Sequence, residues 1–140
     1  MSVVVDASVA LRWFVDSPGT DAALAVLGEQ DPVIAPDLVV AEVSNVAWKL
    51  ARAGRISEKH GSRIAEAVAS CFSGLVANSR LSSRAYAMAR VLDHSVYDCL
   101  YLALAEQEGT YVLTTDRRLA GKVAGTASAD LVRTLSLDPL

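Results

Sequence analysis

Short apolar runs alternate along the chain with longer stretches in which apolar residues recur every three or four positions. The short runs, most of them rich in β-branched residues, predict strands at residues 2–5, 32–35, 75–77, 110–114 and 130–135. Of these, residues 32–35 fit either a strand or a connector. The longer stretches predict helices at residues 7–15, 20–30, 36–53, 57–72, 82–92, 95–108 and 115–124. Because strands alternate with helices, we expect an α/β fold with a mainly parallel central sheet.

Several predicted helices carry signals at their ends. Pro36 lies near the start of the third helix and Gly54 at its end, as the residue preferences of helix termini favour. Ser57 is placed to cap the fourth helix, and Gly74 is expected to stop it. Gly109 is expected to end the helix at residues 95–108.

The composition indicates one globular domain, residues 1–140, with a substantial apolar core. Hydrophobic residues make up 52% of the chain, and the formal net charge of -3 excludes a broad electropositive surface that binds nucleic acid nonspecifically. Local basic groups remain, among them Arg117 and Arg118. The opening SVVV is too short for a signal peptide, and no apolar run approaches the ~18 residues of a membrane span. We therefore expect a cytoplasmic protein.

Four acidic residues differ from the others because each is attached to an apolar element. They are Asp6 directly after SVVV, Glu42 within LVVAEVSNVAW, Asp98 within SVYDCLYLALA, and Asp116 directly after YVLTT. An ionised carboxylate in apolar surroundings needs a partner charge, hydrogen bonds or a metal ion. Structural partners are open for each acid: Asp6 and Asp116 can cap the following helices, Glu42 can pair with Arg12 or Lys49, and Asp98 with an arginine.

Taken together, the four acids favour a shared site. The carboxyl ends of parallel strands meet at one edge of the sheet, so Asp6 and Asp116 are expected to lie together there. If Glu42 and Asp98 face the same edge, the four carboxylates repel one another unless cations bind between them. Carboxylate oxygens suit Mg²⁺, with Mn²⁺ as a possible substitute. The sequence thus predicts an acidic metal site.

Other polar residues complete or limit this hypothesis. Asn45 lies three residues after Glu42 on the same helical face, and Thr114 adds a hydroxyl close to Asp116. Both also fit ordinary surface or turn roles. The two histidines are too few for a zinc site, and the two cysteines lack metal-ligand spacing.

The ordered set VVVDAS, VVAEVSN, SVYDCLYLALAE and VLTTD resembles the PIN-domain ribonucleases, in particular the VapC-type toxins of toxin–antitoxin pairs. The resemblance covers nearly the whole chain, and its most specific part is YDCLYLALAE joined to LTTD. It implies a three-layer α/β/α fold. It also places Asp6, Glu42, Asp98 and Asp116 at the family's acidic metal-binding and catalytic positions, with Thr114 and Asn45 at supporting ones.

By this resemblance, the protein is expected to hydrolyse RNA phosphodiesters as a Mg²⁺-dependent endoribonuclease. The family also implies a homodimer and a cognate antitoxin protein as partner. Some members carry a further acid just beyond the last aspartate, where this chain has Arg117 and Arg118. These arginines therefore leave the number of metal ions open, and either one is a candidate for steadying the RNA strand.

Three alternatives remain at this point. A PIN-like module that binds RNA or protein with little or no cleavage is compatible with the same acids. A haloacid-dehalogenase-type phosphatase usually needs a second aspartate where Ser8 stands. A two-component receiver domain expects adjacent early acids and a lysine after the last strand, and neither is clear here. Metal-dependent cleavage separates the binding module from the nuclease.

Overall fold

The computed structural model describes residues 1–138 and contains one sheet of five parallel strands. The strand order is β3-β2-β1-β4-β5, so the first strand lies at the centre. The strands are β1 (Val3–Val5), β2 (Val33–Pro36), β3 (Gly74–Val76), β4 (Val112–Thr114) and β5 (Val132–Thr134). Every strand pair is parallel, which confirms the predicted α/β class and the predominantly parallel sheet.

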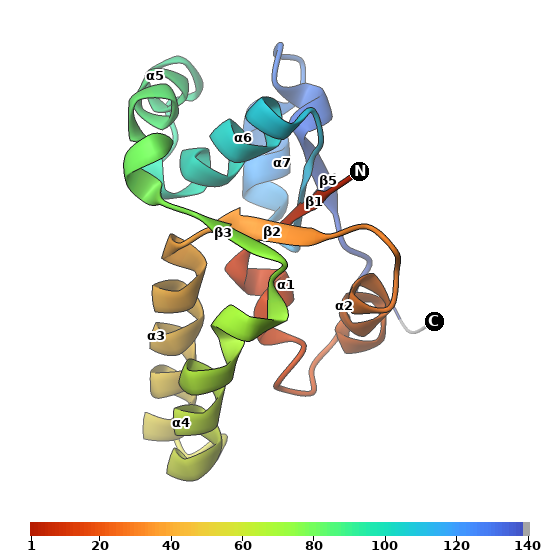
Figure 1. Ribbon diagram of the computed structural model, residues 1–140, viewed down its shortest axis with the longest axis vertical. Coiled ribbons are helices and arrows are strands. Elements are labelled where there is room, and N and C mark those ends of the chain that lie inside the picture. Colours follow the sequence, from red (N-terminus) through yellow and green to blue (C-terminus); the bar gives the residue numbers. More distant parts are fainter. Residues whose placement is uncertain (139–140) are drawn as a thin grey trace.

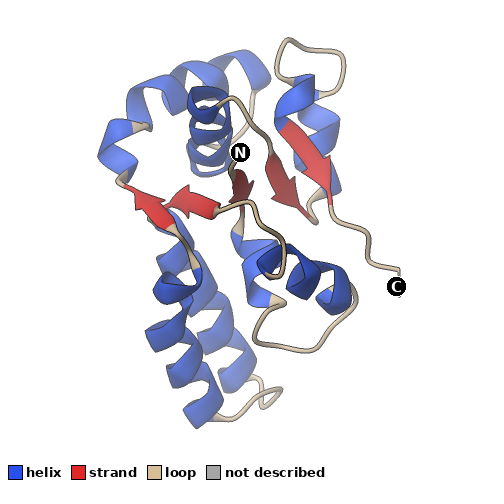
Figure 2. Ribbon diagram, turned by 45° about the vertical axis from the view of Figure 1, so that its right-hand side comes forward, coloured by secondary structure: helices blue, strands red, loops and turns tan. Residues whose placement is uncertain are grey.

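The helices cover both faces of this sheet, as Figures 1 and 2 show. One face carries α1 (Ala7–Leu11), α2 (Thr20–Leu27), α3 (Leu38–Arg52) and α4 (Glu58–Ala67). The other carries α5 (Ser82–Leu92), α6 (Val96–Glu108) and α7 (Arg117–Val123). Short 3₁₀ helices span Val68–Cys71, Asn78–Arg80 and Ala129–Leu131. The result is the expected three-layer α/β/α arrangement.

The core explains why the central strand is apolar at every position. All of β1 is buried, since helices cover both faces of a parallel sheet. Helix α6 is buried continuously from Cys99 to Ala105 and contacts β1, β2 and β4. This burial accounts for the weak amphipathic pattern of α6. Among residues 1–138, no helix combines the length and the apolar character needed to cross a membrane.

Several predicted boundaries were wrong. Pro36 ends β2, so α3 begins at Leu38, while α2 ends at Leu27 and α4 at Ala67, before their predicted ends. Helix α1 ends at Leu11, four residues before the predicted end, and the chain then turns. Side chains stabilise this turn: Arg12 Nη1 donates to the Ser8 carbonyl over 2.6 Å, and Trp13 Nε1 donates to the Ala23 carbonyl over 2.8 Å. Gly74 does not stop a helix. It begins β3 and pairs with Ile34 after the chain has already become extended.

Candidate active site

The predicted strand-end acids lie at one edge of the sheet. Strands β1 and β4 are parallel neighbours, with Val5 beside Leu113. Asp6 follows β1 directly and caps α1, since its Oδ1 accepts from the backbone amides of Ser8 (3.0 Å) and Val9 (3.3 Å). Parallel pairing therefore brings the end of β1 beside the segment that follows β4, as the sequence predicted.

Two hydroxyls connect these strand ends around Asp6. Ser8 Oγ donates to Asp6 Oδ1 over 2.6 Å, and Thr114 Oγ1 donates to Asp6 Oδ2. The Ser8 hydroxyl also accepts from the Thr115 amide over 3.0 Å, and the Thr114 hydroxyl accepts from the Asp116 amide over 3.0 Å. Each hydroxyl thus orients the carboxylate and holds the β4–α7 junction at the same time.

Asp6 is 9% exposed, and this burial raises the pKa of its carboxyl group. The hydrogen bonds from Ser8, Thr114 and Val9 act in the opposite direction, while the charge of Asp98 adds to the increase in pKa. Desolvation outweighs the hydrogen bonds because burial disfavours the charged form. Asp6 is therefore held in place by neutral donors, and within residues 1–138 it forms no ion pair.

Glu42 reaches the site from α3, which lies on the opposite face of the sheet from α6 (Figure 1). Its Oε1 accepts a 2.6 Å hydrogen bond from the phenol of Tyr101 on α6. Burial raises the pKa of Glu42; Tyr101 opposes this, and the charges of Asp98 and Asp6 add to it. The partner of Glu42 is therefore a buried phenol and not Arg12 or Lys49.

Asp98 lies in the first turn of α6 and is held by a histidine. His94 Nε2 lies 2.5 Å from Asp98 Oδ2, and the side chains are 7% and 31% exposed, respectively. Ser95 caps α6 between them. The expected arginine partner of Asp98 is thus replaced by an imidazole four residues earlier in the chain.

The remaining predicted residues are less closely engaged. Asp116 caps α7, with its Oδ1 accepting from the Arg118 amide over 2.8 Å, and it meets Asp6 only through the Thr114 hydroxyl. Asn45 is exposed on α3, one turn beyond Glu42, and no hydrogen bond links it to the acids within residues 1–138. The structure thus brings Asp6, Glu42 and Asp98 within range of one another's charge, whereas Asn45 stays apart.

Two further residues of this site were missed in the sequence. Tyr101 stands in an apolar helix and had the pattern of a core residue, and His94 was considered only as a zinc ligand. The available signal was their spacing: Tyr101, three residues after Asp98, shares a helical face with it, and His94 lies four residues before it, just ahead of the helix. In the described part of the chain, no three His, Cys, Asp or Glu side chains form a group that could hold one metal ion.

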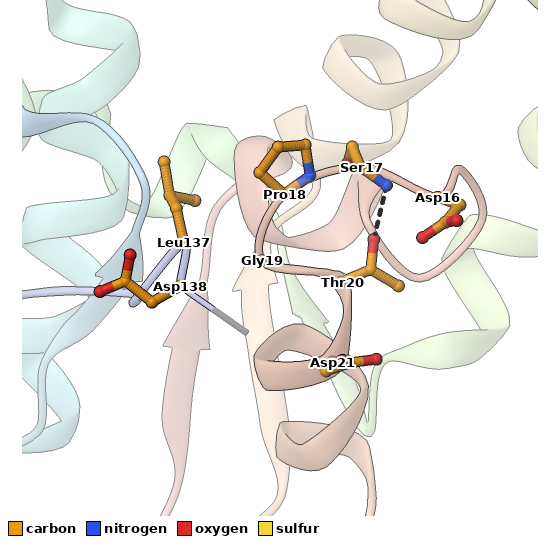
Figure 3. Close-up of a pocket in the computed structure, with 8 residues that line it drawn as sticks. All are labelled: Asp16, Ser17, Pro18, Gly19, Thr20, Asp21, Leu137 and Asp138. Atoms are coloured by element: carbon orange, nitrogen blue, oxygen red, sulfur yellow. Dashed lines mark hydrogen bonds between the residues drawn. The ribbon is translucent and has the colours of Figure 1, made fainter. Parts of the chain in front are cut away.

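One pocket adjoins these acids, and a second lies away from them. One, of about 450 Å³, adjoins the site and is lined by Asp98, His94, Ser95, Arg118 and Lys122, among others. Another, of about 130 Å³, lies between the loop after α1, the start of α2 and the segment at Leu137 and Asp138 (Figure 3). None of the predicted site residues lines this smaller pocket, so the chemistry of the acids lies elsewhere.

Comparisons with known proteins agree with this architecture. Residues 3–124 match the PIN domain family. Ribonuclease VapC3 of Pyrobaculum aerophilum is 36% identical over 124 residues, which cover 87% of this chain and 95% of that protein. The crystal structure of PAE2754 from Pyrobaculum aerophilum superposes with a TM-score of 0.70 at 25% identity, over 90% of this chain and 82% of that one. A toxin–antitoxin complex from Klebsiella pneumoniae shares the fold at 16% identity, with a TM-score of 0.68 over 99% of this chain and 100% of that one. The chain therefore belongs to the PIN domain family.

Proposed function

We propose that this protein is a divalent-metal-dependent endoribonuclease and the toxin of a toxin–antitoxin pair. The observation that carries the proposal is the convergence of three carboxylates from separate elements. Burial raises the pKa values of Asp6 and Glu42, and the charge of Asp98 adds to the increase for both. No lysine or arginine lies within 4.0 Å of any of them among residues 1–138. The 36% identity to a protein named a ribonuclease supports the same chemistry.

The chemistry of the donor set suits a hard divalent cation, whereas the described positions of the acids do not group three ligands around one ion. Carboxylate oxygens are the preferred ligands of Mg²⁺ and Mn²⁺, and within residues 1–138 no Lys or Arg forms an ion pair with Asp6, Glu42 or Asp98. Asp6, Asp98 and Asp116 would hold the cation directly, and Glu42 directly or through water. When bound, Mg²⁺ lowers the pKa of an attacking water and stabilises negative charge on the phosphodiester.

The protein's own donors orient these ligands without occupying them fully. Tyr101 engages only Oε1 of Glu42, and His94 engages only Oδ2 of Asp98. Within residues 1–138, no donor bonds to the second oxygen of either carboxylate, so one oxygen of each is available. Such outer partners fix ligand geometry and commonly affect metal binding strongly when removed.

RNA as substrate, a cognate antitoxin, a homodimer and a cytoplasmic setting belong to the same proposal. They are supported by the motif resemblance to VapC-type toxins and by the name of the VapC3 relative. Size-exclusion chromatography with light scattering at micromolar protein tests the dimer, and a strictly monomeric mass contradicts it.

The decisive experiment measures cleavage of labelled total cellular RNA by purified protein with Mg²⁺, with Mn²⁺ and with chelator. Asp98→Asn is expected to abolish metal-dependent cleavage because it removes a ligand charge. Glu108→Gln is the matched control, since it neutralises an exposed acid at the end of the same helix. Absence of cleavage by folded, antitoxin-free wild-type protein contradicts the proposal.

One observation favours a second candidate, a PIN-domain module that binds RNA or protein without cutting. Among the described residues, no three potential ligands stand close enough to hold one ion. RNA binding that is unchanged by metal, together with no cleavage, supports this module. In that case the bonds from Tyr101 and His94 serve only to stabilise the fold.

A further inference from the structure

A polar pocket opens directly beside Asp98. It has a volume of about 450 Å³ and lies between the end of α5, residues 93–95, the first turn of α6 and α7. Its cationic side chains, Arg118 and Lys122, both come from α7. They are four residues apart and therefore share one face of the helix.

These two cations are available to a ligand. Among the described residues, neither Arg118 nor Lys122 forms an ion pair, whereas Arg84 binds both carboxylate oxygens of Glu106 at 2.7 and 2.9 Å. Lys122 Nζ donates only to the Asp93 carbonyl, over 3.1 Å. Both side chains belong to exposed residues, and neither is paired with Asp93 or Asp98, the two carboxylates that also line the pocket.

The rest of the lining also favours a polar occupant. Asp93, His94 and Ser95 line the pocket beside Asp98, and Ala89 is its apolar residue. The volume falls in the range of small-ligand sites, which is about 300–1,000 Å³. Because the whole chain carries a net charge of -3, attraction of a polyanion must come from local groups of this kind.

We propose that this pocket is a subsite that binds the phosphate of the RNA nucleotide next to the scissile phosphodiester, with Arg118 and Lys122 as its cations. The inference rests on the proposed ribonuclease function, because Asp98 borders the pocket and would place the cleaved bond beside it. The sequence offered Arg117 and Arg118 equally as residues that steady the RNA strand. The pocket favours Arg118, since Arg117 does not line it.

The test uses full-length protein and a fluorescent single-stranded RNA oligonucleotide, with binding measured by anisotropy in chelator so that no cleavage occurs. Arg118→Ala and Lys122→Ala are each expected to weaken binding about 3- to 10-fold and to reduce the salt slope by about 1. Arg117→Ala is the matched control, with the same charge change on the same helix, and should stay within about twofold of wild type.

A second measurement locates the phosphate. In a series of oligonucleotides, each carries one neutral methylphosphonate linkage at a different position. The neutral linkage at one of these positions should weaken binding to the wild-type protein but not to Arg118→Ala. Arg118→Lys should retain most of the affinity because it keeps the charge. If Arg118→Ala and Lys122→Ala bind like Arg117→Ala, the subsite is refuted. Metal-dependent cleavage by wild type in a parallel assay shows whether the proposed function survives that result.

Discussion

Replacement of Tyr101 by phenylalanine tests whether the phenol holds Glu42 in the site. Tyr101 is 1% exposed, and its hydroxyl donates to Glu42 Oε1 over 2.6 Å. The substitution removes one oxygen and leaves the ring in the core. It therefore isolates the hydrogen bond that links α6 to α3 across the edge of the sheet.

The expected loss follows from the geometry. A hydrogen bond to a charged acceptor contributes about 1.5–3 kcal/mol to stability. Glu42 is only partly buried, so water replaces some of the lost bond, and we expect a decrease of about 1–2 kcal/mol in the free energy of unfolding. For a chain of this size that corresponds to a melting temperature lower by roughly 3–8 °C.

The same change should affect activity more strongly than stability. Without the phenol, the pKa of Glu42 rises further, because the Tyr101 hydrogen bond opposes the effect of burial. A Glu42 carboxylate that the phenol no longer orients is expected to weaken Mn²⁺ binding and RNA cleavage about 10-fold. Urea denaturation in chelator and calorimetric Mn²⁺ titration measure the two effects separately.

Tyr97→Phe is the matched control, since Tyr97 lies on the same helix with its side chain 66% exposed. It should change stability by less than about 0.5 kcal/mol. If Tyr101→Phe is as stable as Tyr97→Phe at neutral pH and binds Mn²⁺ like wild type, the bond to Glu42 does not position the site, and the reasoning is refuted.

Three further predictions concern the donors and charges around the acids. His94→Ala should weaken Mn²⁺ binding about 10- to 100-fold by releasing Asp98, whereas His94→Gln, which keeps a hydrogen-bond donor, should retain part of the affinity. Equal losses of Mn²⁺ affinity in the two variants, measured by calorimetry, contradict this. Thr114→Val should cost about 2–3 kcal/mol in urea denaturation because it leaves a buried oxygen of Asp6 without its donor, while Thr114→Ser should be nearly neutral. In chelator, the free energy of unfolding should fall as pH rises above about 4.5, because the raised pKa values of Asp6 and Glu42 make the folded state bind more protons than the unfolded state. The Asp6→Asn, Glu42→Gln double variant should lose this dependence of stability on pH. An unchanged dependence in the double variant contradicts the assignment.

The sequence predicted the elements of the fold because local patterns determine them. The valines of β1 and the continuous apolar stretch of α6 are buried where the pattern placed them. The strand order was not readable, since it depends on which strands pair across distant parts of the chain. The end of α1 was missed for the same reason: Trp13 bonds to Ala23, ten residues away, and local propensity does not record such a contact.

The sequence singled out the acids of the candidate site but not their hydrogen-bond partners. A carboxylate attached to an apolar run is unusual in itself, so Asp6 and Asp98 were recognisable from their neighbours. Tyr101 was not, because a tyrosine in an apolar helix is ordinary core packing. Its role depends on α3 bringing Glu42 to within 2.6 Å of the phenol, which is a property of the packed layers.

The choice of partners explains how this site can keep negative charge in a largely buried place. An arginine or lysine beside Asp6 or Glu42 would stabilise the carboxylate but would also cancel the charge that attracts a cation. Hydroxyl donors from Ser8, Thr114 and Tyr101 instead orient the oxygens and leave the charge in place. Burial raises the pKa of Asp6 and of Glu42, these hydrogen bonds lower it only in part, and ionisation of the metal-free site is therefore costly. The proposed divalent cation would offset that cost, so an arrangement that makes the metal-free protein less stable would also favour metal binding.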